Sequence, residues 1–192
     1  MGELEDDTCP VGAGGLRYEV REDLLWYGSP SWSRLITTLL KERTFRPVFT
    51  LRLVQHSPRL LRPLAALAHR AACSGAAVDL PSGVTAGPGL KVTHGWGLVV
   101  SPQAVIGRDV VLMHGVTLGG RGGRGGGAPR IGDRAFIGPN ASVLGAVTVG
   151  VGATVSAGCV VVEDVPDSTM VMTDKSALVR RAYERPREKP VR

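Results

Sequence analysis

A repeat of six residues runs through the second half of the chain and limits the folds that the chain can adopt. Written in sixes from Val100, the sequence gives nine hexads that end at Pro166, interrupted once by a glycine- and arginine-rich insertion after Gly120. The first residue of every hexad is Val, Ile or Leu, and the fifth is Ala, Val or Cys. Six is neither the period of an α-helix nor the alternation of a simple strand. The repeat therefore predicts a solenoid in which each hexad is one structural unit.

This pattern suits a short flat strand followed by a tight corner. The aliphatic side chain points into a narrow core, and only a small side chain fits inside the bend. Three hexads close one triangular coil, and coils stack about 4.8 Å apart. We therefore expect a mainly β fold, a left-handed parallel β-helix, with looser hexads from Ala86 and Val92 and two extra residues before Val100. A glycine-rich sandwich is the alternative, which nine hexads in succession disfavour.

The chain changes character near residue 75. Of its 26 glycines, 21 lie between Gly75 and Gly158. Before them, apolar residues three and four apart predict several short amphipathic helices, on which His56 and His69 are expected at polar surface positions. The sequence thus predicts an N-terminal tail and helical segment (1–75), a β-helix domain (76–179) and a basic C-terminal tail (180–192). The helices and the C-terminal tail are expected to cover the ends of the solenoid.

Composition and charge exclude several classes of protein. No stretch approaches 18 uninterrupted apolar residues and the N-terminus is acidic, so we expect no membrane span, no signal peptide and a cytoplasmic protein. Cys9, Cys73 and Cys159 are odd in number and lack CxxC spacing, which predicts neither disulfides nor a zinc site. The net charge is +6, and the insertion RGGRGGG resembles an RNA-binding segment. Because it is short and lacks an aromatic platform, we expect no nucleic-acid partner.

Two histidines interrupt the small residues of the coils. His94 and His114 are each the third residue of a hexad, one full coil apart, so they should stack on one outer edge about one rung apart. Asp79 comes just before the first coil, where a carboxylate would approach His94 and orient it as a general base. From spacing alone, catalysis and a plain structural role are equally plausible for the histidines, as are an orienting role and a turn position for Asp79.

The run DLPSGVTAGPGLKVTHGWG, the motif HGVTLGG and the PRIG that follows the insertion resemble the hexapeptide-repeat acyltransferases, most closely the serine acetyltransferases. The resemblance is dense over residues 79–166. It implies acetyl-CoA as acyl donor, no metal, a homotrimer or a dimer of trimers, and an active site between neighbouring subunits. It also implies that His94 is the catalytic base and Asp79 its partner.

The resemblance further implies an acyl-donor site. Its residues are Gly119, Gly120, Arg130, Gly138, Ala157 and Gly158, and the arginines Arg121, Arg124, Arg180 and Arg181 are candidates for the CoA phosphates. The glycine-rich loop offers backbone N–H groups without side-chain obstruction. Cys159 occupies the small position of its hexad, so it is not expected to act as a nucleophile.

The acceptor side departs from the serine enzymes. Thr93 replaces the usual Asp before the catalytic His, Gly127 and Ala128 replace the usual Arg-His, and His114 stands where Gln is common. Thr93, Trp96 and His114 are therefore the expected acceptor-binding residues. Pro139 replaces a residue whose backbone N–H the family uses near the pantetheine arm. Because the sequence ends in Arg192 and not in Ile, the family's partnership with the cysteine synthase is not expected.

The sequence thus predicts an acetyl-CoA-dependent O-acyltransferase that transfers an acetyl or other acyl group by general-base catalysis in a ternary complex. L-Serine is the default acceptor, with altered recognition residues. The alternatives are an O-acetyltransferase acting on a sugar or specialised metabolite, and a non-catalytic hexapeptide-repeat scaffold. A γ-type carbonic anhydrase shares the fold but needs three histidines around a metal, and the coils offer only His94 and His114.

Overall fold

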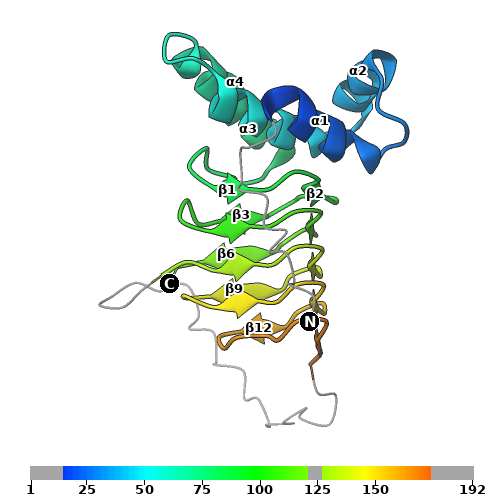
Figure 1. Cartoon of the computed structure of the whole chain (residues 1–192). Helices are drawn as coiled ribbons and strands as arrows, with labels where there is room; N and C mark the ends of the chain where they lie inside the picture. The colour runs from blue at the N-terminus through cyan, green and yellow to red at the C-terminus, as the bar shows by residue number, and fades with distance from the viewer. Residues whose placement is uncertain (1–14, 121–126, 174–192) are drawn as a thin grey trace, which may run out of the picture.

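The chain forms a small helical layer on one end of a stack of β coils, as Figure 1 shows. The computed structural model describes residues 15–120 and 127–173. The helices are α1 (Gly15–Leu25), α2 (Trp32–Lys41), α3 (Phe45–His56) and α4 (Arg62–Ala76). The first strand begins at Thr85, so the chain passes from helix to coil over a few residues after α4. None of these helices, within the ranges described, is long and apolar enough to cross a membrane.

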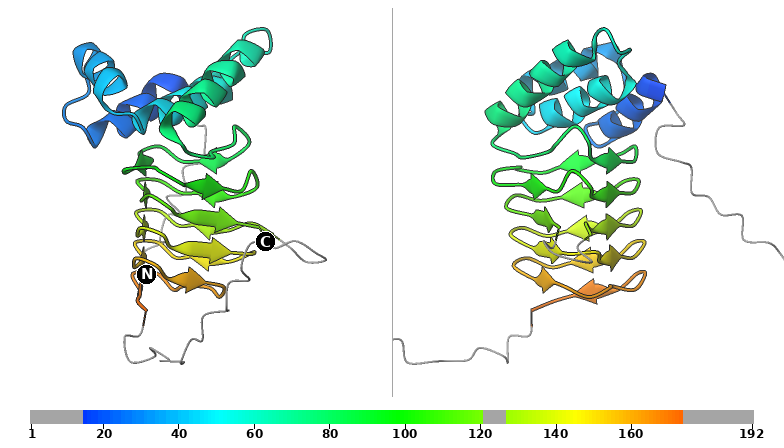
Figure 2. Two further views of the ribbon diagram at one scale, coloured as in Figure 1. Left: turned by 180° about the vertical axis from the view of Figure 1, so that it is seen from behind. Right: turned by 90° about the vertical axis from the view of Figure 1, so that its left-hand side faces the viewer.

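The strands form three parallel sheets, one for each side of the coil. The β1 sheet contains β1 (Thr85–Ala86), β4 (Val105–Ile106), β7 (Arg130–Ile131) and β10 (Thr148–Val149). The β2 sheet contains β2 (Lys91–Val92), β5 (Val111–Leu112), β8 (Phe136–Ile137), β11 (Thr154–Val155) and β13 (Met170–Val171). The β3 sheet contains β3 (Val99–Val100), β6 (Thr117–Gly119), β9 (Ser142–Leu144) and β12 (Val160–Val161). Successive strands belong to different sheets, so the predicted solenoid is confirmed, and the coils are seen stacked in Figure 2.

The hexad pattern explains the core. In each short strand the first residue faces outward and the second, which is the first of a hexad, faces inward, as for Ile106, Leu112 and Ile137, whose side chains are fully buried. The fifth residues, such as Val110 and Ala141, are fully buried as well. A narrow core of two inward side chains per hexad therefore replaces the aromatic core of a larger globular domain, which is why aromatic residues are scarce.

The register shows where residues have been inserted into the regular coils. Partners in the β3 sheet lie 18 residues apart from β3 to β6 (Val99 to Thr117), and β8 and β11 keep the same spacing. From β2 to β5 the spacing is 20, which places two extra residues between Lys91 and Val99. From β6 to β9 the spacing is 25, which places seven extra residues after Gly119. Both insertions fall at corners, and neither displaces a strand from its sheet.

Glycine at the second position of a hexad lets successive coils approach closely. A Cβ atom on Gly132 would lie 2.7 Å from the carbonyl carbon of Gly150 and 2.8 Å from the backbone nitrogen of Val151. We expect Gly132→Ala to lower the free energy of unfolding by about 1–3 kcal/mol, because backbone atoms cannot move aside as a flexible side chain can.

Gly75 provides the matched control for this substitution. A Cβ atom on this glycine, which lies near the end of α4, meets nothing within 4 Å. Gly75→Ala should therefore be neutral or stabilise by about 0.5–1 kcal/mol, because alanine favours the helix. Urea denaturation of both variants measures the contrast, and equal effects would contradict this account of the coil contacts.

A buried cluster of charges joins the helical layer to the first coil. Arg52 of α3 is fully buried, and its Nε and Nη2 donate to the two carboxylate oxygens of Asp23 at 2.9 and 3.1 Å. Its Nη1 and Nη2 also donate to the carbonyl oxygens of Ala86 and Gly87, both at 2.6 Å. Burial raises the pKa of the Asp23 carboxyl above its usual value, against the opposing effect of Arg52. The helical layer is therefore tied to the coils by hydrogen bonds that water cannot reach.

One histidine of the helices, His69, is not at the surface position that the sequence predicts. His69 is 3% exposed and is not a surface residue of α4, because its Nε2 lies 2.7 Å from the carbonyl oxygen of Leu80 and its Nδ1 lies 3.0 Å from the Thr50 hydroxyl. His56 is only partly exposed, and its Nε2 lies 3.0 Å from a carboxylate oxygen of Glu19. The expected N-terminal and C-terminal tails lie outside the described residues, as does Cys9.

Candidate active site

One edge of the triangular coil gathers most of the side chains predicted to take part in chemistry. We call it the histidine corner and define it as residues 93–98, 113–116, 138–141 and 156–159, which join the β2 sheet to the β3 sheet. The register of the β2 sheet aligns Lys91, Val111, Phe136 and Thr154. Three residues further along the later coils, His114, Pro139 and Ala157 form one column, with Gly138 in the column beside it. In the lengthened first corner Trp96 stands above His114, because the Gly115 N–H donates to the Trp96 carbonyl as the Asn140 N–H donates to that of His114. Thr93 and His94 come just before this position.

The two histidines stack as their spacing predicts. The ring centroids of His94 and His114 lie 6.1 Å apart with an angle of 69° between the ring planes. His94 is exposed and its backbone lies in the left-handed region with φ of 63°, within the corner lengthened by two residues. His114 is half-buried, and its Nδ1 has no hydrogen-bond partner among the described residues. The histidine corner thus presents the His94 imidazole to solvent, and the His114 imidazole lies on the next coil.

No ion pair or hydrogen bond joins Asp79 to His94 among the described residues. The Asp79 backbone forms an isolated parallel bridge with Val99, so Asp79 lies next to β3 at the end of the β3 sheet nearest the helices. Its side chain is exposed. The ion pairs found among the described residues join Arg52 to Glu19 and Asp23, and His56 to Glu19. The structure therefore places Asp79 at the same end of the solenoid as His94 without bringing the carboxylate to the imidazole.

The turn between α2 and α3 covers the upper part of the histidine corner. Arg43 donates from Nη2 to the carbonyl oxygen of His94 at 3.0 Å, and its guanidinium carbon lies 3.7 Å from the centroid of the Trp96 ring. The next residue, Thr44, packs so closely on Gly95 that a Cβ atom there would lie 2.6 Å from its Cγ2. Sequence reasoning missed Arg43, because it lies 51 residues before His94 and no spacing or motif connects them.

The predicted donor-binding residues divide between two corners of the coil. Gly138, Ala157 and Gly158 belong to the histidine corner, where a Cβ atom on Gly158 would meet nothing within 4 Å. Gly119 and Gly120 lie at the other end of strand β6, and Arg130 lies on β7, with its side chain exposed. The β3 sheet separates the two groups. Arg121, Arg124, Arg180 and Arg181 lie outside the described residues.

The cysteines in the described ranges do not resemble catalytic nucleophiles. Cys73 is partly buried on α4, and burial raises the pKa of its thiol, so little thiolate is present at neutral pH. Cys159 is buried among the inward residues of the coils, as its hexad position predicts. In the part of the chain that the structure describes, no group of three or more His, Cys, Asp or Glu side chains is arranged to hold a metal ion.

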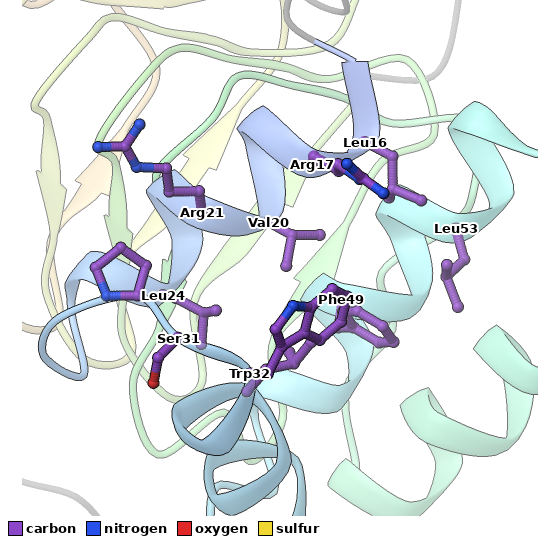
Figure 3. Close-up of a pocket in the computed structure, with 11 residues that line it drawn as sticks. Leu16, Arg17, Val20, Arg21, Leu24, Ser31, Trp32, Phe49 and Leu53 are labelled. Atoms are coloured by element: carbon purple, nitrogen blue, oxygen red, sulfur yellow. The ribbon is translucent and has the colours of Figure 1, made fainter.

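A cavity lies elsewhere, in the helical layer. It has a volume of about 570 Å³, and Figure 3 shows its mainly apolar walls from α1, α2 and α3, among them Leu24, Phe49 and Leu53. Arg17 and Arg21 are the charged residues that line it. None of the predicted site residues borders this cavity, and it holds no acid or base suited to proton transfer. The histidine corner is therefore the candidate active site.

Comparison with curated proteins shows similarity over the coils. The chain is 39% identical to serine acetyltransferase 2 of Arabidopsis thaliana over 104 residues, which are 54% of this chain and 32% of that protein. It is 42% identical to the serine acetyltransferase of Mycobacterium tuberculosis over 96 residues, which are 50% of this chain and 42% of that protein. The matches thus span less than half the length of these curated relatives. No protein-family model matches the chain.

Solved structures match more of the chain, including helices. The soybean serine acetyltransferase complexed with serine has a TM-score of 0.71 and 35% identity, over 84% of this chain and 68% of that one. The Neisseria gonorrhoeae serine acetyltransferase in complex with serine has a TM-score of 0.67 and 32% identity, over 83% of this chain and 67% of that one. The coils are those of the left-handed hexapeptide β-helix, as the repeat predicts.

Proposed function

Because the chain belongs to the serine acetyltransferase family, we propose that it is an acetyl-CoA-dependent O-acyltransferase with L-serine as its default acceptor. The observation that carries the proposal is the exposed imidazole of His94, at a lengthened corner of a solenoid that matches solved members of the family. The imidazole ring of histidine is the side chain that most often serves as a general base.

The reaction follows from the chemistry of a hydroxyl acceptor. A hydroxyl group is a weak nucleophile at neutral pH, so the His94 imidazole takes its proton as the oxygen attacks the thioester carbonyl carbon. The tetrahedral intermediate then collapses, the carbon–sulfur bond breaks, and the imidazolium returns the proton to the sulfur of CoA. Donor and acceptor are bound together, and no group on the enzyme becomes acylated. The raised pKa of Cys73 and the burial of Cys159 support this direct route.

Asp79 is proposed to orient the imidazole in the reacting complex. A carboxylate that accepts a hydrogen bond from one ring nitrogen fixes the tautomer and stabilises the cation that forms. Asp79 is exposed and lies at the same end of the solenoid as His94, which supports the assignment, although binding must bring the two side chains together. Catalytic hydrogen bonds are often longer before substrates bind.

The donor is proposed to lie against the solenoid between two copies of the chain in a homotrimer. The small residues Ala157 and Gly158 leave open space below the histidines, which suits a narrow pantetheine arm. The exposed apolar side chains of Val99, Val160 and Val162 support coverage of the coils by another subunit, because such side chains gain by leaving water. Arg130 is exposed at the opposite corner and is suited to a CoA phosphate.

Two residues of the proposed acceptor site, Thr93 and His114, favour an acceptor other than serine. Thr93 offers no negative charge to the ammonium group of serine, and His114 leaves its buried Nδ1 without a partner among the described residues. A bound hydroxyl compound that satisfied this nitrogen would remove an unfavourable buried polar group. Transfer to a hydroxyl acceptor other than serine, such as a sugar or specialised metabolite, is therefore the second candidate function.

Release of free thiol from acetyl-CoA tests the proposal. The full chain is incubated with acetyl-CoA and, separately, with L-serine, homoserine, sugars and hydroxylated metabolites, and product is identified by mass spectrometry. We expect acceptor-dependent thiol release that yields an O-acetyl ester. The reaction without acceptor gives the background of thioester hydrolysis. Release at this background rate with every acceptor would contradict the enzyme assignment and favour a scaffold.

A further inference from the structure

The main chain around His94 is in contact with residues from outside its own coil. His94, Gly95 and Gly97 all have positive φ values, of 63°, 53° and 70°. This region is unfavourable for a side chain with a Cβ atom, so the conformation at His94 has to be maintained by its surroundings. Two nearby glycines also make the corner easy to deform. A base must keep its position to within a fraction of an ångström, so something has to fix this corner.

The α2–α3 turn, residues 42–44, provides the contacts. Two consecutive turn residues meet three consecutive corner residues: Arg43 bonds to the His94 carbonyl and stacks on Trp96, and Thr44 packs against Gly95. The His94 carbonyl also accepts a hydrogen bond from the Trp96 backbone N–H at 2.7 Å. The guanidinium therefore bonds to the peptide group of the base and covers the ring of its neighbour at the same time, which a lysine cannot do.

From these contacts we propose that Arg43 is a positioning residue for His94, so that the helical layer orients the base as well as covering the coils. The proposal rests on the proposed transferase function. Arg43 acts through the carbonyl oxygen and the stacked indole, and it leaves the imidazole ring free to meet the acceptor. Its loss should leave acetyl-CoA binding intact and reduce the rate of the chemical step, because the ring then samples unproductive positions.

Arg43→Ala and the matched control Arg46→Ala test this role. Arg46 lies three residues away and also donates to carbonyl oxygens, those of Leu39 and Leu40, but these belong to α2 and not to the coils. We expect Arg43→Ala to lower kcat about tenfold to a hundredfold with less than about a twofold change in the KM for acetyl-CoA. Arg46→Ala should keep the kcat of the wild type, and its thermal midpoint should change by about as much as that of Arg43→Ala.

Two further measurements separate positioning from a structural effect. Added ethylguanidinium should restore part of the lost kcat of Arg43→Ala and have no effect on Arg46→Ala. Amide hydrogen exchange over residues 92–98 should accelerate in Arg43→Ala and stay unchanged in Arg46→Ala. If Arg43→Ala fails to fold, Arg43→Lys is used, and it should keep the charge but lose most of the rate.

The outcomes distinguish this proposal from the transferase assignment. Equal kcat values and equal exchange over residues 92–98 in Arg43→Ala and Arg46→Ala would overturn the positioning role. A wild-type chain that acetylates no acceptor would overturn the transferase function on which the role rests, whatever the exchange measurement shows.

Discussion

Replacing His94 with alanine is expected to lower kcat for acetyl transfer roughly 10²–10⁴-fold, the range that a positioned general base contributes. The side chain is exposed and the contacts of residue 94 with Arg43 and Trp96 are made by its carbonyl oxygen, so alanine should preserve them. The thermal midpoint and the affinity for CoA should therefore stay close to those of the wild type. Thiol release, calorimetric titration with CoA and circular dichroism measure the three quantities.

Asp79→Asn is the companion substitution, because it keeps the size of the side chain and removes its charge. If the carboxylate approaches His94 when substrates bind, kcat falls, and the double variant loses little more than His94→Ala alone. Losses that multiply in the double variant would show that Asp79 acts independently of His94. Unchanged transfer in His94→Ala would remove the assignment of the base altogether.

The second large effect is expected on stability. Arg52→Met should lower the free energy of unfolding by about 3–5 kcal/mol, because it removes the guanidinium that pairs with the buried carboxylates of Asp23 and Glu19. Met fills part of the volume but donates no hydrogen bond to the carbonyl oxygens of Ala86 and Gly87. Urea denaturation of the full chain measures the change. A loss below about 1 kcal/mol, typical of an exposed ion pair, would show that the cluster is hydrated.

The same variant has a pH dependence of defined sign. Burial already raises the pKa of Asp23, and removal of Arg52 raises it further. A carboxyl whose pKa is higher in the folded than in the unfolded state contributes stability at low pH that is lost as the pH rises through the folded pKa. The difference between Arg52→Met and the wild type should therefore shrink as the pH falls from 7 toward 4. In the double variant Asp23→Asn/Arg52→Met, the free energy of unfolding should depend less on pH than in Arg52→Met alone.

The sequence predicted the coils well, because every hexad obeys one rule. Position one must be aliphatic and position five small wherever two side chains fill a narrow core, so the strands around Ile106 and Ile137 could be located without coordinates. The repeat also predicted that His94 and His114 lie near each other on one edge of the coil, and their ring centroids are 6.1 Å apart. The orientation of Asp79 could not be predicted, because it lies before the repeat begins and no register governs it.

The helical layer was less predictable. Apolar periodicity indicated the helices but not which way their faces turn, and Trp32, Ile36 and Leu40 of α2 are in fact exposed. No sequence pattern marked Arg52 for burial, yet it is among the most buried side chains of the described residues. The contact of Arg43 with His94 depends on how the helices rest on the first coil, which is a tertiary property with no local signal.

The positions of the two insertions have an evolutionary consequence. Two residues beside His94 and seven after Gly119 are additional to the regular coils, and the strands before and after them remain paired. A scaffold of this kind can acquire or exchange the groups that meet a ligand by lengthening a bend, at little risk to the stack itself. Selection for a new acceptor and selection for a folded protein then act on separate parts of the same gene, so variation in specificity is expected to concentrate in these bends.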